Sequence, residues 1–102
     1  MAYAVNADGS TGQGRIFYDA RARVQQGLKG GLDGLKVDTK GNIFATGPGG
    51  VLVLSPGGKH LGTIVPGDLV ANVAFGDDGS TLYMTVNHQL MRVRTKTKGL
   101  GF

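Results

Sequence analysis

The stretch Leu32–Thr46, LDGLKVDTKGNIFAT, holds two short apolar runs on either side of a turn. The first run, Leu35–Asp38, follows an acid and a glycine, and the second run, Ile43–Thr46, follows the residues Thr39-Lys40-Gly41-Asn42. Short runs rich in β-branched and aromatic residues, separated by a glycine-containing turn, favour an antiparallel hairpin.

An echo of this stretch lies further along the chain at Ala71–Thr85, ANVAFGDDGSTLYMT. Phe44 and Tyr83 occupy the centres of the two second strands and are 39 residues apart. A period near forty residues with four short strands in each unit is typical of a β-propeller blade. The sequence therefore predicts an all-β fold made of four-stranded antiparallel meanders.

The predicted organisation is a partial propeller domain over residues 1–102, with roughly two to two and a half blades. Residues 1–32 are expected to form an outer half-blade and a connecting loop, residues 33–70 a complete blade, and residues 71–102 most of a second. One helical turn is expected around Ala22–Gln26. The expected strands are Met1–Ala7, Arg15–Tyr18, Leu35–Asp38, Ile43–Thr46, Val51–Ser55, His60–Val65, Asn72–Phe75, Thr81–Thr85 and Leu90–Thr95. Propellers close with about four to eight blades, so the chain is expected to be incomplete by itself.

Composition restricts the class of protein. The 19 glycines fall largely between apolar runs, which favours tight turns in a meander over disorder. Cysteine is absent, which excludes a disulfide and a thiolate metal site. No stretch approaches the roughly 20 apolar residues of a membrane span, and no signal-peptide core is present, so no membrane association is expected and the cytoplasm is the default location. A signal peptide upstream of Met1 stays open.

The net charge of +4 could suggest an acidic partner. Basic residues at positions 92, 94, 96 and 98 alternate with Met91, Val93, Thr95 and Thr97, the period of a strand with one solvated face. No stacking aromatic residues are interleaved with these cations, so nucleic-acid binding is not expected.

A meander also predicts which polar residues share one end of the blades. Successive strands reverse direction, so Asp33, Asn72, Gly47–Gly50 and the segment at 86–89 are expected on one rim, and the turns at Lys40, Pro56 and Asp77 on the other. A site built from several blades uses a single rim near the central axis. Asp33 is therefore the first candidate for chemistry, followed by Asn72 and His88.

Each candidate has a structural alternative. An Asp-Gly pair such as Asp33-Gly34 is a common turn element, and Asn72 can bond the loop that enters its strand. His60 and His88 lack a second histidine at a metal-binding spacing. No GxGxxG motif precedes a helix and no GxSxG motif occurs, which disfavours a nucleotide site and a serine hydrolase.

The segments DGLKVDTKGNIFATGPGGVLVLSPGGKHLGTI, NVAFGDDGSTLYMT and LMRVR resemble the family of senescence marker protein, gluconolactonase and luciferin-regenerating enzyme. The resemblance covers nearly the whole chain. It implies a six-bladed propeller with one divalent metal, often Ca²⁺ with Zn²⁺ or Mg²⁺ as alternatives, in the central tunnel, and an activity that opens sugar lactones.

Carried over by position, Asp33 matches the family's aspartate that ligates the metal and is proposed as general base. Asn72 falls where the next blade approaches the axis and is expected to line the substrate pocket, with His88 on the same rim. The family's glutamate ligand near the N-terminus and its asparagine ligand have no counterpart here. Ca²⁺ prefers six to eight oxygen ligands, so the chain alone is expected to be a poor metal site.

Two readings follow from the resemblance. The chain is either part of a metal-dependent lactonase that needs further blades, or a non-catalytic propeller-repeat fragment that associates through its open edges. Two repeats per chain would close a six-bladed ring as a trimer, with three copies of Asp33 facing one axis.

Overall fold

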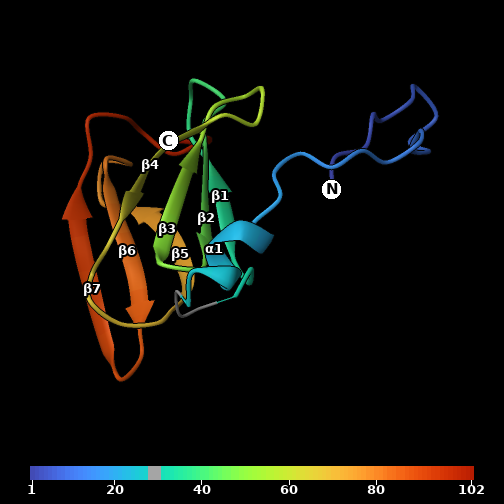
Figure 1. Ribbon diagram of the computed structural model, residues 1–102. Coiled ribbons are helices and arrows are strands. Elements are labelled where there is room, and N and C mark those ends of the chain that lie inside the picture. The colour runs from blue at the N-terminus through green and yellow to red at the C-terminus, as the bar shows by residue number, and fades with distance from the viewer. Residues whose placement is uncertain (28–30) are drawn as a thin grey trace.

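The computed structural model describes residues 1–27 and 31–102 and contains two antiparallel β-sheets that lie side by side (Figure 1). The first sheet has four strands in the order β1-β2-β3-β4, and the second has three in the order β5-β6-β7. Each strand pairs with the next in sequence, which is the meander expected of propeller blades. The predicted all-β class and the two-blade pattern are confirmed.

The strand bounds follow the predicted ones closely. They are β1 Leu35–Val37, β2 Ile43–Gly47, β3 Gly50–Leu54, β4 His60–Ile64, β5 Val70–Gly76, β6 Thr81–Val86 and β7 Gln89–Arg94. The turn between β2 and β3 is Pro48-Gly49, in which Gly49 has a φ of 98°. Proline at the first central position and a positive φ at the second are the requirements of a type II turn, so the sequence specifies this reversal.

The core lies between the two sheets. Phe44 on β2 meets Phe75 on β5 edge to face, with ring centroids 5.2 Å apart. Around them pack Val51, Val70, Val73, Leu82, Met84 and Val86. Alternate residues of each strand supply these side chains, so each sheet also presents a second face away from the core.

The predicted strands Met1–Ala7 and Arg15–Tyr18 are wrong as strands. Only two isolated bridges join these segments, Ala2 to Arg15 and Val5 to Thr11. The turn between them forms as expected, with Gly9 at a φ of 88°. A two-stranded ribbon without a third strand is marginal, and most side chains of residues 1–18 are exposed.

A short helix, α1 Arg21–Gln25, occupies the predicted helical turn. It lies beside the β2–β3 turn, where Arg23 Nε donates a hydrogen bond of 2.8 Å to the carbonyl oxygen of Pro48. Residues 28–30 of the predicted connection lie outside the described residues. Among the residues described, no helix is long and apolar enough to span a membrane.

The C-terminal segment ties the two sheets together. Leu100 N donates to Val37 O, Thr39 N donates to Lys98 O, and Gly99 N donates to Gly79 O. A bridge between Asp38 and Gly99 completes this junction. The tail therefore joins the end of the first sheet to the β5–β6 turn of the second.

Candidate functional site

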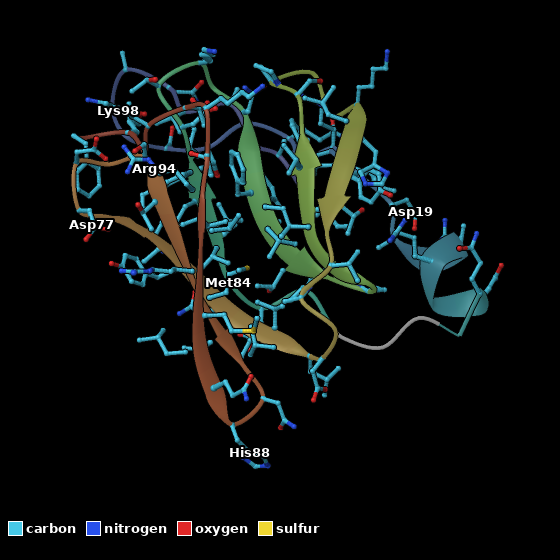
Figure 2. The ribbon with its side chains drawn as sticks, turned by 90° about the vertical axis from the view of Figure 1, so that its left-hand side faces the viewer. Asp19, Asp77, Met84, His88, Arg94 and Lys98 are labelled. Carbon is cyan, nitrogen blue, oxygen red and sulfur yellow. The ribbon has the colours of Figure 1, made fainter. Side chains whose placement is uncertain are left out.

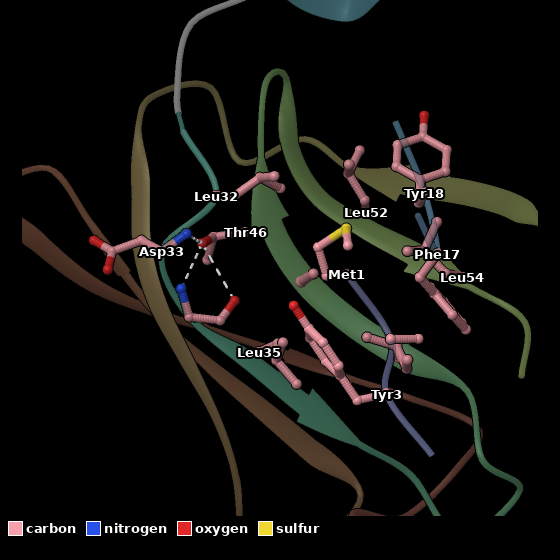
Figure 3. A pocket seen from close by; sticks show the side chains of 14 residues that line it. Met1, Tyr3, Phe17, Tyr18, Leu32, Asp33, Leu35, Thr46, Leu52 and Leu54 are labelled. Carbon is pink, nitrogen blue, oxygen red and sulfur yellow. Dashed lines mark hydrogen bonds between the residues drawn. The ribbon is translucent and has the colours of Figure 1, made fainter. Parts of the chain in front are cut away.

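Asp33 and Gly34 stand directly before β1, and the side chain of Thr46 near the end of β2 holds them. The hydroxyl oxygen of Thr46 accepts the backbone N–H of Asp33 at 3.1 Å and that of Gly34 at 2.9 Å, and its proton is donated to Gly34 O at 3.3 Å. Thr46 is fully buried, whereas Asp33 is exposed (Figure 3). The main chain is therefore held from inside the sheet while the carboxylate stays accessible.

Two hollows meet at Asp33. The larger encloses about 480 Å³ against the face of the first sheet that points away from the core (Figure 3). Its lining is mainly apolar and comprises Met1, Ala2, Tyr3, Phe17, Tyr18, Leu32, Asp33, Gly34, Leu35, Ile43, Ala45, Thr46, Leu52 and Leu54. The smaller, of about 290 Å³, lies toward the second sheet and is lined by Gly31, Leu32, Asp33, Leu69, Val70 and Ala71. The Asp33 carboxylate thus stands beside both spaces.

Asn72, at the second position predicted for the site, lies next to Gly34. A Cβ added at Gly34 would collide with Asn72 Oδ1, so this close approach requires glycine. Asn72 Oδ1 also accepts the N–H of Val73 at 2.9 Å. The residue lines a separate hollow of about 150 Å³ with Val73, Ala74, Tyr83, Thr85 and Leu90, and it does not line either hollow at Asp33.

His88, the third predicted residue, occupies the turn between β6 and β7. Figure 2 places it at the opposite end of the second sheet from Asp77 and Lys98, as the meander predicts. It lines a polar hollow of about 310 Å³ with Pro66, Gly67, Asp68, Val86, Asn87 and Gln89. The three predicted residues therefore border different hollows, although Asp33 and Asn72 come from neighbouring segments.

The described residues offer few ligands for a divalent metal. Within residues 1–27 and 31–102, no group of three histidine, cysteine, aspartate or glutamate side chains could hold an ion. Asp33 offers one carboxylate, whereas Ca²⁺ takes six to eight oxygen atoms. The residues present do not by themselves fit a complete metal centre.

A second carboxylate, which sequence reasoning missed, organises the opposite rim. Asp38 is 1% exposed and accepts hydrogen bonds from the N–H groups of Lys40 and Asn42, from Asn42 Nδ2 and from the hydroxyl of Thr97. Burial by itself would raise the pKa of Asp38, but the hydrogen bonds from Asn42, Thr97 and Lys40 outweigh it and hold the pKa below its ordinary value. Asp38 is therefore a structural anion that fixes the C-terminal tail to the β1–β2 turn.

Thr46 is the other residue that sequence reasoning missed. A threonine in a strand is ordinary, because β-branched residues are favoured there. The repeat could have pointed to this residue, because the two similar stretches both end in threonine, at Thr46 and Thr85.

Comparison with known proteins identifies the family. The sequence matches the SMP-30/Gluconolactonase/LRE-like region over residues 1–88. A gluconolactonase of Zymomonas mobilis subsp. mobilis is 46% identical over 76 residues, which are 72% of this chain and 21% of that protein. An X-ray structure of a protein assigned as a gluconolactonase superposes with a TM-score of 0.83 at 35% identity, over 98% of this chain and 32% of the solved one.

The chain thus spans about a fifth of the curated relative and about a third of the solved chain. Its two sheets match a part of the propeller of that relative. The family match covers most of the sequence, including the stretch around Asp33. The chain belongs to the SMP-30/gluconolactonase/LRE-like family and forms a fragment of its β-propeller.

Proposed function

We propose that this chain contributes part of the active site of a metal-dependent sugar-lactone hydrolase, with Asp33 as its catalytic carboxylate. The observation that carries the proposal is the exposed carboxylate of Asp33 on a main chain that Thr46 holds, between two hollows. The relatives described as gluconolactonases supply the class of reaction.

In the proposed reaction, Asp33 takes a proton from a water molecule while the water oxygen adds to the carbonyl carbon of the lactone. The ring C–O bond then breaks, and the departing ring oxygen takes the proton back from the Asp33 carboxyl group to become a hydroxyl group of the hydroxy acid. Asn72 and His88, on the same rim, are proposed to bind the polar groups of the sugar.

We further propose that Asp33 is one ligand of a divalent cation, with Ca²⁺ ahead of Zn²⁺ and Mg²⁺, because a hard cation prefers oxygen ligands. The remaining ligands would come from blades outside this chain. The apolar face of the first sheet supports this requirement, since it leaves Leu35 56% exposed beside the large hollow.

The ring could be completed by a longer chain or by several copies of this one. The second sheet turns Tyr83, Arg92 and Arg94 away from the core, so a head-to-tail trimer would place two arginines against the apolar face of the next copy. Burying unpaired charge is costly. A trimer would therefore have to keep these two arginines in contact with water at each seam.

The alternative is a non-catalytic propeller repeat. The single carboxylate at Asp33 and the absence of a metal-binding cluster among the described residues favour it. The two functions differ in whether any assembled form of the chain opens a lactone.

The test separates the protein by size-exclusion chromatography, with and without Ca²⁺, and measures the mass of each fraction by light scattering. Each fraction is then assayed for hydrolysis of glucono-1,5-lactone by proton release. The proposal expects hydrolysis in an assembled fraction and none in the 10.6 kDa monomer. Absence of hydrolysis from every fraction would favour the non-catalytic repeat.

A further inference from the structure

The same hydroxyl arrangement occurs once in each sheet. In the first sheet, Thr46 Oγ1 accepts the N–H of Gly34 at 2.9 Å and donates to Gly34 O at 3.3 Å. In the second sheet, Thr85 Oγ1 accepts the N–H of Asn72 at 3.0 Å and donates to Asn72 O at 3.4 Å. Thr46 therefore binds the residue directly before β1, and Thr85 binds a residue near the start of β5.

Strand pairing shows that Gly34 and Asn72 are equivalent positions. Lys36 pairs with Phe44 in the first sheet, and Ala74 pairs with Tyr83 in the second. Two residues before Lys36 and Ala74 stand Gly34 and Asn72, so the residues before those, Asp33 and Ala71, are also equivalent. The second sheet thus repeats the threonine but carries a methyl group where the first carries the carboxylate.

The threonine beside the carboxylate makes one additional bond. Thr46 Oγ1 also accepts the N–H of Asp33 at 3.1 Å, so its two acceptor positions and its single proton are all used. Thr46 is 0% exposed, whereas Thr85 is exposed. Water therefore has little access to replace the hydroxyl of Thr46.

We propose that Thr46 is a positioning residue for Asp33. Its hydroxyl fixes the main chain of Asp33 and Gly34 and so keeps the carboxylate between the two hollows, a role that rests on the proposed function. Thr85 performs the same structural task without a catalytic group, because its sheet carries Ala71 at the equivalent position. The chain thus supplies its own matched control.

The first test measures amide hydrogen exchange by NMR in the full chain. In wild type, the amides of Asp33 and Gly34 are expected to exchange at least about tenfold more slowly than unprotected amides. Thr46→Val keeps the shape and removes the hydroxyl, and it should raise both rates at least tenfold relative to core amides such as that of Leu52. Thr46→Ser should stay within about threefold of wild type, and Thr85→Val should affect Asn72 alone.

If the amides of Asp33 and Gly34 exchanged as fast as unprotected amides in wild type, the inference would be overturned. This result needs no variant, so the test remains decisive even if Thr46→Val does not fold. Unchanged protection of Asp33 and Gly34 in folded Thr46→Val would overturn it equally.

The second test follows line broadening of the Asp33 amide on titration with Mn²⁺, a paramagnetic divalent probe. Thr46→Val should need about tenfold more Mn²⁺ than wild type or Thr85→Val for the same broadening. Equal sensitivity of Thr46→Val and wild type would overturn the positioning role. Absence of broadening at Asp33 in wild type would instead contradict the metal ligand of the proposed function, and hydrogen exchange would still decide the role of Thr46.

Discussion

The two sheets of this chain share a framework and differ in what they attach to it. In each sheet a threonine hydroxyl holds the beginning of the first strand, Thr46 at β1 and Thr85 at β5. The first sheet places Asp33 beside this bond and turns an apolar face outward, whereas the second places Ala71 there and turns Arg92 outward. The comparison shows that the repeated strands and threonines set the backbone positions, whereas individual residues such as Asp33 determine where a charged group stands.

The largest expected effect contrasts the core between the sheets with the face that borders the large hollow. Leu82→Ala should lower the free energy of unfolding by about 4 kcal/mol, because Leu82 is fully enclosed between the sheets. Leu52→Ala should cost about 2 kcal/mol, because Leu52 is as buried as Leu82 but lines the large hollow, whose walls can close over the missing atoms. Urea unfolding measures both values. Equal costs would contradict a hollow beside Leu52 and would indicate that this space is filled in solution.

The next effect compares the two turn acids. Asp38→Asn should lower the free energy of unfolding by about 2 kcal/mol, because the amide removes the anion that four donors bind. Asp77→Asn, at the corresponding turn of the second sheet, should cost less than about 0.5 kcal/mol, because Asp77 is exposed and accepts only from Tyr83 among the described side chains. Similar losses for the two variants would contradict a structural role confined to Asp38.

Asp38 also predicts a pH dependence. The folded pKa of Asp38 lies below its unfolded value, so its contribution to stability is complete above the unfolded pKa of about 3.9 and disappears as the pH falls through the folded pKa. Asp38→Asn should therefore flatten the acid limb of stability against pH, measured by urea unfolding at successive pH values. If the stability of Asp38→Asn fell at acid pH in the same way as that of wild type, other carboxylates would control the acid dependence.

A smaller effect separates the two threonines. Thr46→Val should cost about 1.5 kcal/mol, because two N–H groups lose their acceptor inside the sheet. Thr85→Val should cost about 0.5 kcal/mol, because one N–H is affected and water reaches the site. Thermal unfolding of both variants measures the difference, and a larger loss at Thr85 would reverse the comparison.

The sequence predicted the strands well where consecutive apolar runs form a meander of three or four strands. All seven strands of the two sheets were found, since apolar alternation and turns such as Pro48-Gly49 fix local conformation. The pairs at Met1–Ala7 and Arg15–Tyr18 were wrong, because local pattern does not show whether a third strand lies alongside.

The site was less accessible to sequence reasoning. A spacing of 39 residues relates Phe44 to Tyr83, but a spacing of 38 relates Gly34 to Asn72, because the β5–β6 connection is one residue longer. One residue back from Gly34 and Asn72, Asp33 therefore corresponds to Ala71, at the irregularity of β5, and not to Asn72. The roles of Thr46 and Asp38 depend on hydrogen bonds to residues distant in sequence, which no local pattern reveals.

The most direct measurement of the central claim is lactone hydrolysis by assembled wild-type protein, by Asp33→Asn and by Asp77→Asn under identical conditions. Asp33 is exposed, so the substitution should leave the fold intact. The account predicts at least about a 100-fold loss of kcat/KM in Asp33→Asn, the usual contribution of a general base, and a rate within about twofold of wild type in Asp77→Asn. Equal rates for wild type and Asp33→Asn, at any level including zero, would contradict a catalytic carboxylate at Asp33.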